Sequence, residues 1–278
     1  MSRNLTLQVE PTNACNLNCK ICMRQNLERP IAFLSLDNFK KILDSGDFRY
    51  VGLHGWGEPL LNKQLFEMVK YAEVKGVSTN LTTNGTLLQE NIDNILSSGL
   101  REIAFGIYDK ELFIKVTPQI GKLIQEKRKQ NSKRPKTYLD ITIYDSNLEQ
   151  IPQLVRFAPE LGIDAVILHR LFNIYKVDSS AKYISAEEEE ALFAKLRQLA
   201  NLLKLELYLP PKHSYPCRIV KRSIFVTVEG KVTPCTYLYD LHLGDALEDG
   251  IGKVMRSKAY TGFVKNMKKH PICSRCQW

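Results

Sequence analysis

Short runs of apolar and β-branched residues alternate with longer amphipathic segments from residue 5 to about residue 208. The short runs have the length and composition of strands, and the longer segments repeat their apolar positions at helical spacing. The strands are predicted at 5–10, 49–55, 77–83, 102–108, 138–144 and 164–170. The helices are predicted at 36–46, 61–76, 89–99, 112–130, 149–162 and 185–204, and most of them end in glycine, the usual stop.

Six β–α units in series predict an α/β fold with a parallel sheet and right-handed crossovers. Such units form either an open doubly wound sheet or an incomplete barrel, and periodicity does not choose between the two. In both arrangements the active site is expected at the carboxyl ends of the strands.

The pattern changes after residues 207–212. Residues 223–235 predict a β-hairpin with its turn at Glu229 and Gly230, and one helix is predicted over 251–269. We therefore predict two domains, 1–208 and 209–278. The second is small for an independent hydrophobic core, so a bound metal group would help it to fold.

Composition is that of a globular protein, with 44% hydrophobic and 25% charged residues among 278. The first residues lack a secretory signal, and no apolar run approaches the roughly 18 residues needed to span a bilayer. We expect a cytoplasmic protein without a membrane partner. The net charge of +9 is dispersed, with its densest run at 122–136, which favours a solvated face over a nucleic-acid site.

Seven cysteines fall into two groups, and their odd number leaves one thiol over in any disulfide scheme. Cys15, Cys19 and Cys22 have the spacing C-x3-C-x2-C directly after the first predicted strand. Three ligands are too few for a structural zinc ion. They suit a [4Fe–4S] cluster in which one iron has no protein ligand and can bind a substrate or cofactor.

Three motifs at successive strand ends resemble those of the radical S-adenosylmethionine (SAM) superfamily. They are the three-cysteine loop, "GWGEP" at 55–59 and "TTNG" at 82–85. The resemblance implies a partial (β/α)6 TIM-like barrel in which SAM chelates the unique iron. Reductive cleavage of SAM then gives a 5′-deoxyadenosyl radical, which abstracts a substrate hydrogen atom. A flavodoxin- or ferredoxin-type electron donor is implied as a partner.

The same resemblance assigns SAM contacts to particular residues. The "GEP" residues Gly57, Glu58 and Pro59 would hold the SAM amino group, and Thr83 and Asn84 would contact the cofactor. Two positions depart from the family pattern. Ile21 stands where an aromatic residue usually precedes the third cysteine, and it would still bind the cofactor by offering its backbone to the adenine of SAM. Gly106 stands where the fourth strand often supplies Ser or Thr.

Cys217, Cys235, Cys273 and Cys276 form the second group, which by residue type alone fits a tetrahedral zinc site. Their order resembles the twitch or SPASM tails of radical SAM enzymes, which implies an auxiliary [4Fe–4S] cluster instead. Together with the chain length, this tail resembles the small dehydrogenases that oxidise an aminocyclitol alcohol, of the 2-deoxy-scyllo-inosamine type.

If all seven thiols ligate clusters, none remains to return a hydrogen atom, as an epimerase requires. We therefore predict net oxidation of a small polar metabolite, a sugar or aminocyclitol, with the electron passed to the auxiliary cluster. His54, Arg170 and Tyr108 end strands and are the candidate catalytic residues, while Glu10 faces the cavity or caps the loop. The alternatives are a maturase of a ribosomal peptide, tRNA modification, epimerisation and a non-enzymatic zinc module.

Overall fold

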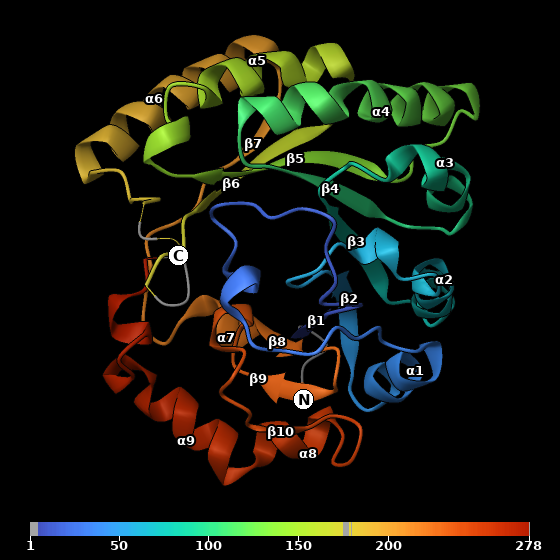
Figure 1. Ribbon diagram of the computed structural model, residues 1–278, viewed down its shortest axis with the longest axis vertical. Coiled ribbons are helices and arrows are strands. Elements are labelled where there is room, and N and C mark those ends of the chain that lie inside the picture. The colour runs from blue at the N-terminus through green and yellow to red at the C-terminus, as the bar shows by residue number, and fades with distance from the viewer. Residues whose placement is uncertain (1–4, 175–177, 179, 278) are drawn as a thin grey trace.

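A curved, mostly parallel sheet forms the centre of the computed structural model, which describes residues 5–174, 178 and 180–277 (Figure 1). All six strands predicted from the sequence are present, and a short seventh strand follows them. The parallel strands run in chain order across the sheet. They are β1 (Leu5–Val9), β2 (Phe48–Leu53), β3 (Ser78–Thr83), β4 (Glu102–Ile107), β5 (Lys136–Ile143), β6 (Ala165–Arg170) and β7 (Glu206–Tyr208).

Helices cover the outer, convex face of this sheet, as Figure 1 shows. They are α1 (Leu36–Asp44), α2 (Leu65–Val74), α3 (Leu88–Ser97), α4 (Lys110–Lys129), α5 (Ile151–Leu161) and α6 (Ala186–Leu203). Local sequence begins several of them: the Asp109 carboxylate accepts a hydrogen bond from the Leu112 amide at 2.8 Å, and Ser185 forms a capping box with Glu188. The predicted α/β partial barrel is confirmed.

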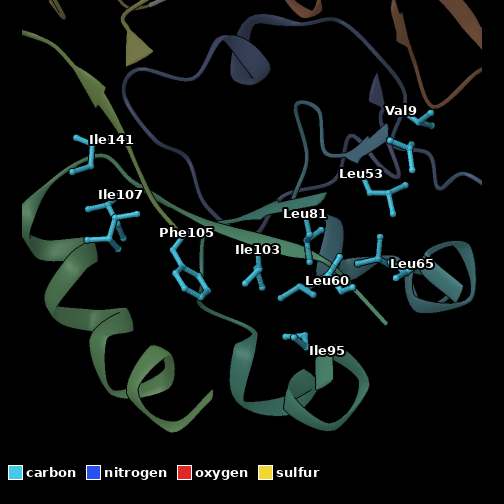
Figure 2. Packing of buried hydrophobic residues seen from close by; sticks show 14 of the residues in the cluster. Val9, Leu53, Leu60, Leu65, Leu81, Ile95, Ile103, Phe105, Ile107 and Ile141 are labelled. Atoms are coloured by element: carbon cyan, nitrogen blue, oxygen red, sulfur yellow. The ribbon is translucent and has the colours of Figure 1, made fainter. Parts of the chain in front are cut away.

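The hydrophobic core lies between the sheet and these helices. Along β5 every second residue is buried, and Leu139 and Ile141 point outward to the helices. Figure 2 shows this layer, in which side chains from β1 to β5, such as Leu81 and Phe105, pack against Leu65 and Ile95 of α2 and α3.

The inner face of the sheet is polar, unlike the usual barrel interior of branched apolar side chains. A cavity of about 310 Å³ lies within it. Its lining includes Tyr50, His54, Asn80, Thr82, Glu102, Tyr138, Asp140 and His169. The barrel therefore has room for water or a polar ligand below the strand ends.

The C-terminal segment extends the same sheet on its other side. β8 (Ser223–Val226) pairs in parallel with β1, and β9 (Lys231–Thr233) and β10 (Gly244–Asp245) add antiparallel strands. The predicted hairpin is confirmed, with Gly230 at φ +86° in its turn. The rest of this segment contains α7 (Arg218–Arg222), α8 (Ile251–Arg256) and α9 (Lys258–Asn266).

The prediction of one helix over 251–269 is wrong. Ser257 is extended, with φ −64° and ψ 155°, and separates α8 from α9. Its hydroxyl accepts a hydrogen bond from the Tyr260 amide, so this residue starts a new helix rather than continuing the first. Within the described residues no helix is both long and apolar enough to cross a lipid bilayer. The division into domains at residue 208 stays a prediction.

Candidate active site at the carboxyl ends of the strands

The three N-terminal cysteines lie together in the loop after β1, which crosses the middle of the curved sheet in Figure 1. Their side chains line one cavity of about 190 Å³. Burial, followed by the neighbouring thiols of Cys22 and Cys15, raises the pKa of Cys19 to about 12. Three thiolates here would repel one another in a dehydrated site, so an electropositive iron cluster is the kind of group that stabilises them.

Hydrogen bonds within the loop hold its two ends. Asn13 donates from Nδ2 to the Pro30 carbonyl and accepts from the Ala32 amide through Oδ1, both at 2.8 Å. Arg24 donates to the Leu17 carbonyl at 2.9 Å. The loop is thus folded around the cysteines by its own side chains.

Glu10, at the end of β1, connects the loop to the C-terminal hairpin. Its carboxylate is fully buried, accepts from Arg29 at 2.5 Å, and also accepts from the Trp56 and Val228 amides at 3.1 Å. Arg29 pairs in addition with Glu229 at 2.8 Å. Of the two roles predicted for Glu10, its contacts correspond to capping the loop.

Glu58 is a buried carboxylate at the edge of the cysteine cavity, 2% exposed. It accepts hydrogen bonds from the Thr83 hydroxyl at 2.7 Å, the Asn84 amide at 2.8 Å and the Leu60 amide at 3.0 Å. Burial raises its pKa, and these hydrogen bonds offset only part of that rise. No cationic side chain of the described chain pairs with Glu58, so the site suits an ammonium group from a ligand.

The motif around Glu58 requires close backbone packing. A Cβ on Gly57 would lie 2.2 Å from the Thr12 carbonyl oxygen, so only glycine fits there. The Glu58 amide donates to the Ala14 carbonyl at 2.7 Å, and Pro59 starts a 3₁₀ turn. These contacts place "GEP" directly against the cysteine loop.

Asn84 reaches the loop from β3. Its Nδ2 donates to Asn16 Oδ1 at 2.9 Å and lies 3.9 Å from Cys15 Sγ. The three motifs recognised in the sequence therefore meet in one place.

Of the two positions that depart from the family pattern, Ile21 lies at this cavity, and Gly106 lies next to Tyr108, which lines it. Ile21 lines it and packs beside Tyr144 and Leu171. At Gly106 a Cβ would be 2.8 Å from the Tyr108 hydroxyl oxygen, so the tyrosine occupies the space that a larger residue would fill. Burial raises the pKa of Tyr108 well above its usual value, which keeps the phenol protonated.

His54 lines both the cysteine cavity and the polar cavity beneath it. Burial, and then the nearby His169, lower its pKa to about 4, so its imidazole is neutral near pH 7. His169 lies 3.4 Å from the Asp140 carboxylate. Asp140 was not among the site residues predicted from the sequence. Asp140 is on β5 at an inward-facing position, and strand alternation is the signal that could have identified it.

Arg170 borders the cysteine cavity, but its guanidinium is held elsewhere. It pairs with Glu189 of α6 at 2.6 Å and donates to the carbonyls of Pro210 and Pro211 at 3.1 and 2.6 Å. This network fastens α6 and the following segment to the end of β6. Such contacts fit a positioning residue more readily than one that binds substrate.

Cys217, Cys235 and Cys273 pack together with Val220, Leu238 and Met267 in a small core, and Cys276 is close enough to Cys235 and Cys273 to raise their pKa values. Burial is the first cause that raises the pKa of Cys235 to about 12 and of Cys273 to about 11, and the nearby thiols add to it. Like the N-terminal group, these thiols need a cationic group to become ligands. In the described part of the chain, no three Cys, His, Asp or Glu side chains converge tightly enough for a single metal ion.

An aromatic contact joins the two cysteine sites. Tyr237 lines the N-terminal cysteine cavity, stacks on Phe172 at 4.1 Å between ring centroids, and meets Trp56 edge-on at 5.8 Å. Trp56 also donates from Nε1 to the Thr236 carbonyl at 3.0 Å. Tyr237 follows Cys235 by two residues, which is the only sequence signal for it.

Comparison with known proteins identifies both parts of this arrangement. Residues 9–109 match the Radical SAM superfamily, and residues 217–277 match SPASM, an iron–sulfur cluster-binding domain. The chain is a radical SAM enzyme with a C-terminal SPASM domain. Its cofactors are therefore SAM, a [4Fe–4S] cluster and SPASM iron–sulfur, in place of zinc in the tail.

Two relatives illustrate the range of proteins that this chain resembles. The tungsten-containing aldehyde ferredoxin oxidoreductase cofactor-modifying protein of Pyrococcus furiosus is 24% identical over 307 residues, covering 97% of this chain and 86% of the relative. The PqqA peptide cyclase of Granulibacter bethesdensis is 25% identical, covering 82% and 67%.

Two solved structures share the fold. Streptococcus suis SuiB bound to S-adenosylmethionine has a TM-score of 0.80 at 17% identity, covering 98% of this chain and 70% of SuiB. SuiB has also been solved bound to its precursor peptide SuiA. BtrN in complex with AdoMet and 2-DOIA has a TM-score of 0.57 at 18% identity, covering 98% and 92%. BtrN is thus one similar fold among several.

Proposed function

We propose that this radical SAM enzyme modifies a peptide substrate by hydrogen-atom abstraction. The observation that carries the radical chemistry is the cavity in which three thiols meet a buried, cation-free carboxylate. The peptide substrate rests on the relatives, since a PqqA peptide cyclase resembles the chain and SuiB was crystallised with a precursor peptide.

In this proposal the residues around the cysteine cavity have separate roles in binding the cluster and SAM. Cys15, Cys19 and Cys22 would hold the cluster, and the Glu58 carboxylate would accept hydrogen bonds from the ammonium group of SAM. The Thr83 hydroxyl and the Asn84 amide fix the Glu58 carboxylate by hydrogen bonds, so it need not reorganise when SAM binds. When bound and reduced, the cluster and SAM would supply the radical chemistry for abstracting a hydrogen atom from substrate.

The four cysteines of the tail, Cys217, Cys235, Cys273 and Cys276, would hold an auxiliary cluster, and that cluster would supply a site for electron uptake. The cysteine count also favours net oxidation, since all seven thiols are assigned to clusters. The neutral imidazole of His54, at the floor of the cavity, can accept the proton that leaves an oxidised substrate. Arg170 positions the end of β6, and the Tyr108 phenol borders the radical site.

Oxidation of a small polar metabolite is the second candidate. The polar cavity of about 310 Å³ favours it, because hydroxyl, imidazole and carboxylate side chains line that space. This cavity could equally receive one polar side chain of a peptide, so substrate identity decides between the candidates.

Anaerobic reconstitution with iron, sulfide and SAM tests the proposal. Addition of the reductant dithionite should produce 5′-deoxyadenosine. A candidate peptide encoded by a neighbouring gene should then show, by mass spectrometry, the mass decrease of two hydrogen atoms. Turnover of an aminocyclitol or sugar without any peptide product would support the second candidate. Deuterium from solvent at an inverted carbon would show epimerisation and contradict net oxidation. Absence of 5′-deoxyadenosine would contradict both candidates.

A further inference from the structure

The polar cavity inside the barrel directly adjoins the cysteine cavity, because His54 and Thr82 line both. Strand β5 shows how the two spaces follow one another. Its successive inward positions are Tyr138 and Asp140, which line the polar cavity, and Thr142, which lines the cysteine cavity. The polar cavity therefore extends from the site at the carboxyl ends of the strands toward their amino ends.

His54 lies at the boundary between the two cavities, with its ring turned toward the polar one. Val51 and Leu53 pack in the core outside the sheet, so Gly52 faces inward. A Cβ on Gly52 would lie 2.7 Å from His54 Nε2, which means that the imidazole occupies the space over this glycine. Gln8 Nε2 lies 3.5 Å from His54 Nδ1. The ring is thus held with Nδ1 at Gln8 and Nε2 toward the amino end of β2.

Asp140 and His169 form a pair next to His54. His169 Nε2 lies 3.4 Å from the Asp140 carboxylate, and both side chains keep some contact with solvent. His169 is close enough to contribute to the lowered pKa of His54, and Asp140, after burial, raises the pKa of Tyr108. Burial raises the pKa of Asp140 itself, and His169 offsets only part of that rise. A carboxylate with a raised pKa is the better proton acceptor.

Hydroxyl and carboxylate groups continue from this pair to the amino ends of the strands. Glu102, the first residue of β4, accepts hydrogen bonds from the Tyr50 hydroxyl and from the Tyr138 hydroxyl at 3.1 Å. Tyr208 packs beside Tyr138, with 6.4 Å between ring centroids. All four side chains line the polar cavity, so groups that can pass a proton extend along its whole length.

These groups adjoin the radical site, and the proposed binding of the cluster and SAM uses none of them. We infer that the polar cavity is the proton exit of this enzyme: the Asp140–His169 pair takes a proton from His54 and releases it to solvent at the amino ends of the strands. This inference rests on the proposed net oxidation.

The loss of two hydrogens from the substrate balances as follows. One leaves as a hydrogen atom to the SAM-derived radical. The other leaves as an electron, taken up by the auxiliary iron–sulfur cluster, and as a proton, taken up by His54. Transfer of that proton to the Asp140–His169 pair returns the His54 imidazole to its neutral form, so that it can act as a base again. Asp140 and His169 act through His54 and do not touch the reacting atoms.

Asp140→Asn tests the exit, because the amide keeps the shape of the side chain but does not take up a proton. The measurement is the amount of oxidised peptide formed per 5′-deoxyadenosine, with the peptide of the neighbouring gene as substrate. SAM cleavage precedes proton loss, so this ratio should fall about tenfold or more. The control Asp164→Asn changes a carboxylate outside the cavity, which accepts from the Thr137 amide at 2.7 Å, and should change the ratio less than about twofold.

Formate distinguishes a proton acceptor from a merely structural side chain. Asp140→Ala leaves room for this small carboxylate, so added formate should raise its ratio of product to 5′-deoxyadenosine about fivefold or more. Asp140→Asn fills the same room and should not respond. An unchanged ratio in Asp140→Asn, or no rescue of Asp140→Ala, would overturn the inference. A raised KM with an unchanged ratio would place a substrate side chain in the cavity and overturn it as well.

A measurement without substrate tests the contact between the two imidazoles. Exchange of the imidazole Cε1 hydrogen in deuterium oxide, followed by mass spectrometry across pH, gives the pKa of His54 in the reconstituted enzyme. His169→Gln should raise this pKa, because His169 is one cause of its lowering. No response of His54 would overturn the inference whatever the substrate.

The turnover assay also separates the proton exit from the proposed function. If wild type cleaves SAM but oxidises neither a peptide nor a small metabolite, the proposed oxidation fails, and its proton exit fails with it. If wild type oxidises its substrate and Asp140→Asn does so with the same ratio, only the proton exit fails.

Discussion

Glu58 is the residue whose chemistry depends most on a ligand, because its buried charge has hydrogen-bond donors but no cation within the described chain. Glu58→Gln keeps the size of the side chain and removes that charge. A hydrogen bond to a charged group contributes roughly 1.5–3 kcal/mol, so SAM should bind about 10- to 100-fold more weakly. Calorimetric titration of SAM into the reconstituted protein measures this. Unchanged SAM affinity would contradict the assignment of Glu58.

His54 makes stability depend on pH. Its pKa is about 4 in the folded protein, below the 6.5 of an unperturbed imidazole, so the unfolded chain binds the proton more readily. The stabilisation is complete above pH 6.5 and is lost as pH falls toward 4, by roughly 3 kcal/mol in total. His169 and Asp140 are the other titratable groups beside it.

Urea unfolding at pH 7 and pH 4.5 checks this expectation. His54→Gln should lose less stability than wild type over the interval. A larger or equal loss in the variant would show that His54 is not buried as described.

At the residue scale, motif residues were predictable and their supports were not. Cys15, Glu58 and Asn84 were identified because short local patterns carry them. Arg29 and Tyr237 act through contacts with residues up to about 200 positions away, and local sequence does not reveal those partners. Arg170 was predicted to be catalytic because it ends a strand. That position does not reveal that its guanidinium pairs with Glu189 on α6.

The β8–β9 hairpin is the element whose attachment depends on a buried ion pair. Arg29→Met would leave the Glu10 carboxylate buried without its cation, which typically costs about 3–5 kcal/mol. Adding Glu10→Gln should recover part of that loss, because the stranded charge is then removed. Lys75→Met is the control: it breaks an exposed pair with Asp44, so it should destabilise the protein far less than Arg29→Met. Denaturant unfolding of the four proteins gives the comparison, and equal losses for Arg29→Met and Lys75→Met would contradict it.

At the element scale, the strands were predictable because apolar runs of strand length are strong local signals. The break at Ser257 was not, since this residue is compatible with either a helix interior or an N-cap. The pairing of β8 with β1 could not be predicted from the sequence either, because tertiary packing sets the register between distant strands. The choice between barrel and open sheet came from the family resemblance, not from periodicity.

For the whole molecule, iron content is the simplest test of two separate cluster sites. Two four-iron clusters give about eight irons per chain, and Cys15→Ala/Cys19→Ala/Cys22→Ala should lower this by about four. Cys273→Ala/Cys276→Ala is the matched change in the tail and should remove the other four. Anaerobic iron and sulfide analysis measures both. Loss of all iron on changing either group would mean that the sites do not load independently.

The sheet places residues 223–226 next to residues 6–9, although more than 200 residues separate them along the chain. During synthesis the first strand therefore leaves the ribosome long before its neighbour exists. Likewise, Glu10 and Trp56 form their hydrogen bonds with the Val228 amide and the Thr236 carbonyl only after those residues have been synthesised. Assembly machinery that delivers iron and sulfide would thus meet a complete N-terminal pocket only after residue 236 has been translated.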